Sequence, residues 1–218
     1  MKPDALQDWP CVVISRDVPD NPRLAAFGAG LPTPWPLAVP MLYPAVWGEL
    51  TGKATDFRET PGAWGCWRTH CRLWEDMLCR EWPGVVVFED DAVFRPDFAA
   101  RLAAFLAAAP DDWDQLYFGG QHLRGKWGEA GPGVRRAINV NRTHAYAVRA
   151  TDRTRAGYWR LCSMAPARCA GARGHVDYVL GELHETGQLT AYCPAEWLCG
   201  QAAGVSATTG KTCAENYW

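Results

Sequence analysis

The chain has 218 residues, of which 48% are hydrophobic and 21% are charged, and its formal net charge is −2. This length is enough to bury one sizeable core, so we expect a single domain over residues 1–218. The slightly acidic balance excludes the general basic footprint of a nucleic-acid-binding protein, although local basic patches remain open.

The first half of the chain is predicted to form two strands separated by an irregular stretch and a helix. Residues 11–15 are rich in β-forming side chains and are expected to be a strand, whereas the prolines at 32–44 exclude a helix and favour irregular or edge structure. Large apolar residues recur at spacings of three and four within 62–80, which predicts a helix. Residues 85–88 read Val-Val-Val-Phe, a run without polar alternation that is typical of a strand buried on both faces.

The second half continues the alternation of strands and helices. Strands are expected at 115–118, 143–149 and 190–193, and helices from Asp97 to Pro110, at 152–163 and at 175–185. Residues 119–136 carry six glycines and are predicted to be a long loop. Short strands that alternate with helices over this length indicate an α/β fold with a mainly parallel central sheet flanked by helices.

The cysteines and tryptophans bear on the cellular compartment of the protein and on the kind of site that it contains. The nine cysteines are an odd number and no apolar signal segment opens the sequence, so we expect buried free thiols in the cytoplasm. No CxxC pair or zinc-finger spacing occurs, and structural zinc is not expected. No apolar run approaches the ~20 residues that span a bilayer. Twelve tryptophans favour a site with aromatic walls, with core packing as the alternative for each one.

Three consecutive acidic residues, Glu89, Asp90 and Asp91, follow the buried strand at 85–88. In an open α/β sheet, ligands bind at the carboxyl ends of the strands, so these carboxylates are expected beside a substrate. They repel one another unless a positive charge lies between them, and Mg²⁺ or Mn²⁺ prefers such oxygen ligands together with substrate phosphates. The alternative is an acidic junction that is only solvated.

An ordered set of motifs runs through most of the chain. The motifs are ISRD at 14–17, PAVWGELTGK at 44–53, TPGAWGCWRTHCRLW at 60–74, VVVFEDDAVF at 85–94, WDQLYFGG at 113–120, THAYAV at 143–148 and HVDYVL at 175–180. In this order they resemble glycosyltransferase family 25, the lipopolysaccharide-type glycosyltransferases and procollagen galactosyltransferases. The sequence departs from the family in having Thr69-His70 for Ser-His and a compressed N-terminal region.

The resemblance implies a GT-A-like nucleotide-sugar-binding fold and a hexosyltransferase that uses a nucleotide sugar, with a UDP-sugar as the first expectation. The acidic motif would then hold Mn²⁺ or Mg²⁺ against the donor diphosphate. Glu89 and Asp91 point to the same side of an extended backbone. We expect Asp91 to contact the metal directly and Glu89 to lie nearer the ribose or a metal-bound water, with Asp90 as a structural partner.

Members of the family are regarded as inverting enzymes, which require a carboxylate to deprotonate the acceptor hydroxyl. Asp177 is the candidate base, with a helix cap as its alternative role. Glu182 and Glu185 are the substitute candidates for this base. His70 is expected to pack in the core with one hydrogen bond.

Further residues are expected around the donor because they lie in the family motifs or near predicted strand ends. They are Ser15, Arg16, Tyr117, Gly119, Gln121, His144 and Gln201, with Lys211 nearby in the tail. His144 has a core role as its alternative. For four cations of the glycine-rich segment an ordinary solvated loop is the first interpretation, and closure over the donor phosphates is the alternative: Arg124, Lys126, Arg135 and Arg136.

The acceptor and the reaction class have alternatives. The acceptor is expected to be a glycan, a protein hydroxyl or, less favoured because the chain is not basic, a hydroxymethylated DNA base. A metal-dependent phosphoester hydrolase is the alternative enzyme, since clustered acids also serve two-metal hydrolysis. A non-catalytic sugar-binding relic of the same fold is the third interpretation.

Overall fold

A computed structural model describes residues 3–53, 57, 59–123, 127–163, 175–206 and 210–217. Its helices are η1 (Pro3–Asp8), α1 (Pro22–Ala29), α2 (Gly48–Thr51), α3 (Pro61–Cys79), α4 (Phe98–Ala108), α5 (Asp152–Ser163) and α6 (Val176–Glu185). Its strands are β1 (Cys11–Ser15), β2 (Met41–Pro44), β3 (Gly84–Glu89), β4 (Ala92–Phe94), β5 (Gln115–His122), β6 (Trp127–Gly131), β7 (Val134–Ala137), β8 (Val140–Arg149), β9 (Ala191–Pro194), β10 (Cys199–Gln201), β11 (Gly204–Val205) and β12 (Thr212–Cys213).

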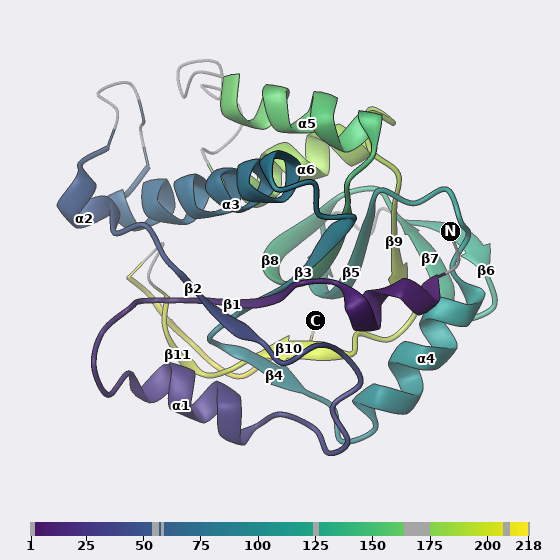
Figure 1. Cartoon of the computed structure of the whole chain (residues 1–218), viewed down its shortest axis with the longest axis horizontal. Coiled ribbons are helices and arrows are strands. Elements are labelled where there is room, and N and C mark those ends of the chain that lie inside the picture. The colour runs from purple at the N-terminus through teal and green to yellow at the C-terminus, as the bar shows by residue number, and fades with distance from the viewer. Residues whose placement is uncertain are drawn as a thin grey trace.

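An eight-stranded sheet in the order β2-β1-β3-β8-β5-β9-β7-β6 forms the centre of the molecule (Figure 1). The pairs β1–β2, β1–β3 and β5–β9 are parallel, whereas β8 is antiparallel to both of its neighbours and β7 to both of its own. All strands except β7 and β8 therefore run in one direction. This arrangement confirms the predicted α/β fold with a mainly parallel central sheet.

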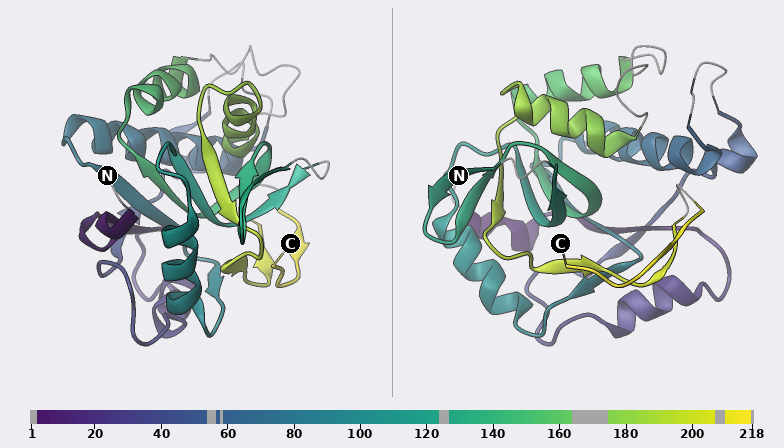
Figure 2. Two further views of the ribbon diagram at one scale, coloured as in Figure 1. Left: turned by 90° about the vertical axis from the view of Figure 1, so that its right-hand side faces the viewer. Right: turned by 180° about the vertical axis from the view of Figure 1, so that it is seen from behind.

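Helices cover both faces of the sheet (Figures 1 and 2). Helices α3, α5 and α6 pack on one face, and η1, α1 and α4 contribute to the apolar cluster on the other. Strand β3 requires cover on both faces, because its side chains from Val85 to Phe88 are all apolar and all fully buried. None of the helices within the described ranges combines the length and the apolar character needed to cross a bilayer.

Helix α3 begins and ends within one residue of the predicted bounds because its signals are local. Thr60 is the N-cap residue and accepts a hydrogen bond from the backbone N–H of Ala63, and Pro61 occupies the first helical position. Trp67, Trp74 and their neighbours bury one long stripe of the helix against the sheet. The N-terminal half of the helix lies at the edge where β1 and β3 end.

The glycine-rich segment 119–136 is not the long loop that was predicted. Strand β5 continues through Gly119 to His122, and β6 and β7 form an antiparallel hairpin in which Gly131 pairs with Val134. The glycines supply the turn, since Gly131 and Gly133 have φ values of 138° and 72°. The prediction was wrong because glycines that make a hairpin turn were taken as a sign of irregular structure. Arg124 and Lys126 lie outside the described residues.

Candidate active site

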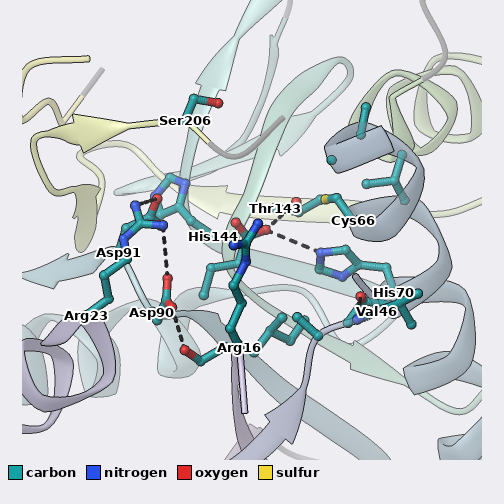
Figure 3. Close-up of a pocket in the computed structure, with 18 of the residues that line it drawn as sticks. Arg16, Arg23, Val46, Cys66, His70, Asp90, Asp91, Thr143, His144 and Ser206 are labelled. Atoms are coloured by element: carbon teal, nitrogen blue, oxygen red, sulfur yellow. Dashed lines mark hydrogen bonds and ion pairs between the residues drawn. The ribbon is translucent and has the colours of Figure 1, made fainter. Parts of the chain in front are cut away.

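A cavity of about 450 Å³ opens at the carboxyl ends of β1 and β3. It is enclosed by the N-terminal halves of α3 and α6, the beginning of β8 and the C-terminal tail (Figure 3). Seven of the predicted site residues line it: Ser15, Arg16, Glu89, Asp91, His144, Asp177 and Gln201. The structure therefore brings together residues from five separate parts of the chain.

Asp90 and Asp91 share a cationic partner, Arg23, in the first turn of α1. The guanidinium of Arg23 lies 3.3 Å from Asp91 Oδ2 and 3.5 Å from Asp90 Oδ1 (Figure 3). Ser15 Oγ donates a hydrogen bond to Asp90, which agrees with the structural role expected of this residue. Burial and, after it, the nearby charge of Glu89 raise the pKa of Asp91 to about 7. Asp91 is thus a carboxyl that lacks sufficient positive charge around it.

The C-terminal tail reaches this pair of acids through a small antiparallel sheet. Strand β10 pairs with β4, which places Gln201 opposite Ala92. Gln201 Nε2 donates to Asp91 Oδ2 at 2.9 Å, and the backbone N–H of Ala202 donates to the carbonyl of Asp91 at 2.7 Å. The tail and α1 therefore both hold the acidic turn, since Gln201 and Arg23 donate to the same oxygen of Asp91.

Glu89 lies in a different environment from Asp91. Its Oε1 accepts a hydrogen bond from Thr143 Oγ1 at 2.7 Å and lies 3.3 Å from His70 Nε2. Burial would raise the pKa of Glu89, but the hydrogen bonds from His70 and Thr143 and the charge of His70 outweigh it and lower the pKa. Glu89 is therefore held as a carboxylate.

His70 has more partners than the single hydrogen bond expected for it. Its Nδ1 lies 2.9 Å from the hydroxyl of Tyr146, which also accepts a hydrogen bond from Trp74 Nε1 at 3.2 Å. All three side chains are buried. They form a rigid connection from the core to Glu89.

A bulge in β8 delivers two further residues to the cavity. On β5, Gly119 and Gln121 are two residues apart, whereas their partners on β8, Ala145 and Asn141, are four apart. The extra residues include Thr143 and His144, which line the cavity, and Arg142, whose φ is 83°. Such a bulge re-aims side chains at the end of a strand.

Asp177 lies across the cavity and holds this bulge in place. Its Oδ2 accepts a hydrogen bond from the backbone N–H of Arg142 at 3.0 Å, and its Oδ1 accepts one from the backbone N–H of Tyr178 at 2.9 Å. Burial raises the pKa of Asp177. The residue is therefore a carboxylate in the cavity wall that also binds two backbone amides, one of them in the first turn of α6.

Gly119 supports His144 and does not line the cavity, contrary to the predicted contact with the donor. A Cβ atom at Gly119 would lie 2.3 Å from His144 Nε2 and 2.7 Å from the carbonyl oxygen of Cys199. Only a residue without a side chain allows His144 to pack so closely. Burial lowers the pKa of His144 to about 4, so its ring is neutral near pH 7.

Other predicted residues lie away from the cavity. Tyr117 is fully buried because it lies inside β5, where its ring packs against His184. Glu182 is exposed. It lies five residues after Asp177 on α6, and this spacing places it on a different face of the helix. Gln121 lines a second cavity, together with Arg135.

The remaining alternatives also have other partners. Glu185 accepts a hydrogen bond from Asn139. Arg136 pairs with Tyr192 in the sheet. Lys211 is exposed in the tail and accepts a backbone hydrogen bond from Ser206. Neither these residues nor Arg135 line the cavity that holds the acids.

Sequence reasoning missed Asn21, Arg23 and Thr143. Asn21 caps α1, accepts hydrogen bonds from the backbone N–H groups of Arg23 and Leu24, and donates to Ser15 Oγ at 2.9 Å. An asparagine followed by proline is a recognisable helix start, so Asn-Pro-Arg at 21–23 was the available signal. Nothing local connects Thr143 with Glu89.

The acids can accept a hard divalent cation. Asp91 Oδ1 is buried and has no hydrogen-bond partner among the described residues, which is costly unless a positive group approaches it. Both hydrogen bonds to Glu89 reach the same oxygen, Oε1. Oxygen ligands of this kind suit Mg²⁺ or Mn²⁺, which take few protein ligands and retain sites for water or phosphate.

Comparison with known proteins identifies a related family. Residues 53–148 match the family model described as "Glycosyltransferase family 25 (LPS biosynthesis protein)". A "Glycosyltransferase 25 family member" of Aedes aegypti is 36% identical over 80 residues, which are 34% of this chain and 13% of that protein. A "Procollagen galactosyltransferase 1-A" of Xenopus laevis is 34% identical over 83 residues, covering 36% of this chain and 14% of that protein.

A human relative named "Inactive glycosyltransferase 25 family member 3" is 36% identical over 63 residues, covering 28% of this chain and 11% of that protein. The chain thus matches only a small part of the length of these relatives. The comparisons confirm the predicted resemblance to family 25 and support a glycosyltransferase.

Proposed function

We propose that this chain, whose residues 53–148 match glycosyltransferase family 25, transfers a hexose from a nucleotide sugar to an acceptor hydroxyl with inversion. The observation that supports the proposal most is the convergence of the acidic triplet, three arginines and Asp177 on one cavity. A UDP-hexose is the donor that we propose. Its charged diphosphate requires cationic surroundings, and its sugar requires a carboxylate on the other side of the reacting carbon.

The proposed cofactor is Mn²⁺ or Mg²⁺, held by Asp91 and Glu89. When bound, it would neutralise the charge that develops on the departing diphosphate. The buried free oxygen of Asp91 supports this assignment. Arg23 offsets part of the charge of Asp90 and Asp91 and keeps the acidic turn compact.

Arg16 is the cation that we propose for the donor phosphates. Its guanidinium stacks on the Trp47 ring at 4.6 Å and lies 3.9 Å from Glu49, with about half of its side chain exposed. This stacking holds the charge at the mouth of the cavity at little conformational cost. A diphosphate that binds beside it competes only with a weak surface ion pair.

Asp177 is the proposed general base. A base works best when its pKa approaches the working pH, and burial raises the pKa of Asp177 in that direction. Each of its oxygens accepts one backbone hydrogen bond and retains a lone pair for the proton of the acceptor. The two hydrogen bonds fix the carboxylate while the proton moves.

The acceptor that we propose first is a glycan hydroxyl, with a protein hydroxyl second and a hydroxymethylated DNA base third. The name of the Xenopus relative, a procollagen galactosyltransferase, supports the second choice. The cytoplasm is the proposed location, in keeping with the eight cysteines of the described chain, all of which are free thiols.

The test is the release of nucleoside diphosphate from a panel of sugar nucleotides, measured with Mn²⁺ and again with an added chelator. We expect release that depends on one donor, rises with a glycan acceptor and disappears with the chelator. Hydrolysis of simple phosphoesters with no preference for a sugar nucleotide would replace the proposal by the hydrolase alternative. Sugar-nucleotide binding without turnover would identify a non-catalytic relic.

A further inference from the structure

A second group of metal-binding side chains lies in the same cavity, apart from Asp90 and Asp91. Cys66 and His70 are four residues apart on α3 and therefore face the same side of the helix. Glu89 is the last residue of β3 and lies beside them. Cys66 Sγ, a ring nitrogen of His70 and a carboxylate oxygen of Glu89 all lie within 4.8 Å of one another.

The distances approach those of a zinc site. Zn²⁺ binds sulfur at about 2.3 Å and nitrogen or oxygen at about 2.0–2.2 Å, so tetrahedral ligand atoms lie roughly 3.3–3.8 Å apart. His70 Nε2 and Glu89 Oε1 already meet this condition at 3.3 Å. Cys66 has only one side-chain torsion to adjust to close the remaining gap, and its side chain borders the cavity (Figure 3).

The electrostatic surroundings also favour a cation. Burial and the charges of Glu89 and Asp177 raise the pKa of the Cys66 thiol well above its usual value. The same negative field attracts a divalent ion, which can replace the thiol proton. The cavity gives such an ion a path from solvent.

The supporting hydrogen bonds are those of a typical histidine ligand. Metal-binding histidines usually hydrogen-bond through the ring nitrogen that faces away from the metal. His70 Nδ1 lies 2.9 Å from the Tyr146 hydroxyl, and Trp74 Nε1 fixes that hydroxyl from the other side. The ring is therefore oriented before any ion arrives.

We propose that Cys66, His70 and Glu89 form a site for a thiophilic divalent ion, Zn²⁺ in the first place, with its fourth position open to the cavity. Binding releases to solvent the Cys66 thiol proton and the Nε2 proton that His70 donates to Glu89, and the metal-bound ring keeps its other proton on Nδ1. The sulfur ligand separates this site from the oxygen site at Asp91, because Mg²⁺ and Mn²⁺ prefer oxygen. The spacing Cys-x₃-His and the third ligand from a distant strand explain why zinc-finger patterns do not reveal it.

Occupation of this site has a consequence that rests on the proposed function. Glu89 belongs both to the thiophilic site and to the proposed Mn²⁺ site, and one carboxylate that binds Zn²⁺ is less available to the donor complex. Zn²⁺ is therefore expected to inhibit sugar transfer reversibly.

The binding test uses Co²⁺ as a spectroscopic substitute for Zn²⁺, with the full chain under reducing conditions. We expect one equivalent of Co²⁺ to produce the charge-transfer absorption of a Co²⁺–thiolate bond, and Zn²⁺ to displace it. The band should disappear in Cys66→Ser and persist in Cys79→Ser, which removes an exposed thiol from the end of the same helix. A band that persists in Cys66→Ser, or no stoichiometric band in the wild type, would overturn the proposal.

Alkylation of the wild-type protein gives a second readout that does not depend on the folding of a variant. Zn²⁺ should slow the reaction of Cys66 with iodoacetamide at least tenfold, as followed by peptide mass spectrometry, and leave Cys79 unaffected. Equal rates with and without Zn²⁺ contradict the site. Inhibition is measured separately, as the ratio of transfer rates with and without Zn²⁺ in each variant. Zn²⁺ binding without any transferase activity would reject the proposed function alone.

Discussion

Glu89 and Asp91 are two residues apart in the sequence, yet the fold gives them opposite electrostatic environments. Glu89 lies beside α3 and β8, where His70 and Thr143 donate to it and lower its pKa. Asp91 faces the tail and α1, where Gln201 and a partly exposed arginine compensate its burial only in part and its pKa is raised. The comparison suggests that Glu89 is organised by the protein itself, whereas Asp91 is left to be completed by a ligand.

The largest effect is expected from Asp91→Asn, which removes the negative charge of the carboxylate that a ligand is expected to complete. We predict that sugar transfer falls by about 10²–10³-fold, the usual loss when a group that stabilises transition-state charge is removed. The change is nearly isosteric, so the circular dichroism spectrum should stay the same. Steady-state rates at saturating donor measure the effect.

The matched control for this prediction is Asp97→Asn, which alters an exposed acid six residues further along the chain. Its transfer rate should stay within twofold of the wild type. Full turnover by the Asp91→Asn variant would show that the Asp91 carboxylate is not part of the catalytic machinery.

The second effect tests the carboxylate across the cavity. Asp177→Asn removes the proposed base and should lower the transfer rate by about 10²-fold. In the wild type, the rate should fall as the pH drops below the raised pKa of Asp177, because the protonated carboxyl cannot accept a proton.

Glu182→Gln is the control for this residue, since Glu182 lies on the exposed face of the same helix. We expect it to retain the wild-type rate. If Glu182→Gln lost activity and Asp177→Asn kept it, the base would have been assigned to the wrong carboxylate.

Local signals were sufficient for much of the fold. The helix predicted at 62–80 is Pro61–Cys79, the strand predicted at 85–88 is Gly84–Glu89, and the helix predicted at 152–163 has these bounds. In the first two cases, apolar side chains and a Pro or Gly residue at the start act within one element. The acids and Asp177 were also among the predicted site residues that line the cavity. They could be found because they lie at the end of a predicted strand and at the start of a predicted helix.

The two environments of the acids could not be predicted, because the partners come from far along the chain. Arg23 precedes Asp91 by 68 residues, and Thr143 follows Glu89 by 54. The bulge that aims Thr143 depends on a positive φ at Arg142, a non-glycine residue without a local signal for this conformation. Only the pairing of β5 with β8 creates it.

The third prediction concerns the contribution of the Glu89 carboxylate to the free energy of unfolding. Glu89→Gln keeps an acceptor for His70 and Thr143 but removes the charge that strengthens both hydrogen bonds, so the free energy of unfolding at pH 7 should fall by about 1–2 kcal/mol. Urea denaturation measures the change. Glu75→Gln, at an exposed position of α3, should change it by less than about 0.5 kcal/mol. Equal stability of both variants would mean that Glu89 is not organised by its neighbours.

The smallest effect is a difference in the pH dependence of stability. The pKa of Asp91 in the folded protein is about 7, above its ordinary value of 3.8, so between these values the folded state binds more protons than the unfolded state. The contribution of Asp91 to stability is therefore present at low pH and is lost as the pH rises toward 7. Glu89 has the opposite sign, since its lowered pKa makes a contribution that is present above 4.5 and is lost as the pH falls.

Asp91→Asn should therefore gain stability relative to the wild type as the pH is raised from 4 to 7. Glu89→Gln should lose stability relative to the wild type over the same interval, so the two difference curves diverge. Urea denaturation at pH 4, 5, 6 and 7 without added metal measures both. Parallel curves for the two variants would mean that the acids share one environment, because a single field around the triplet would shift both pKa values in the same direction.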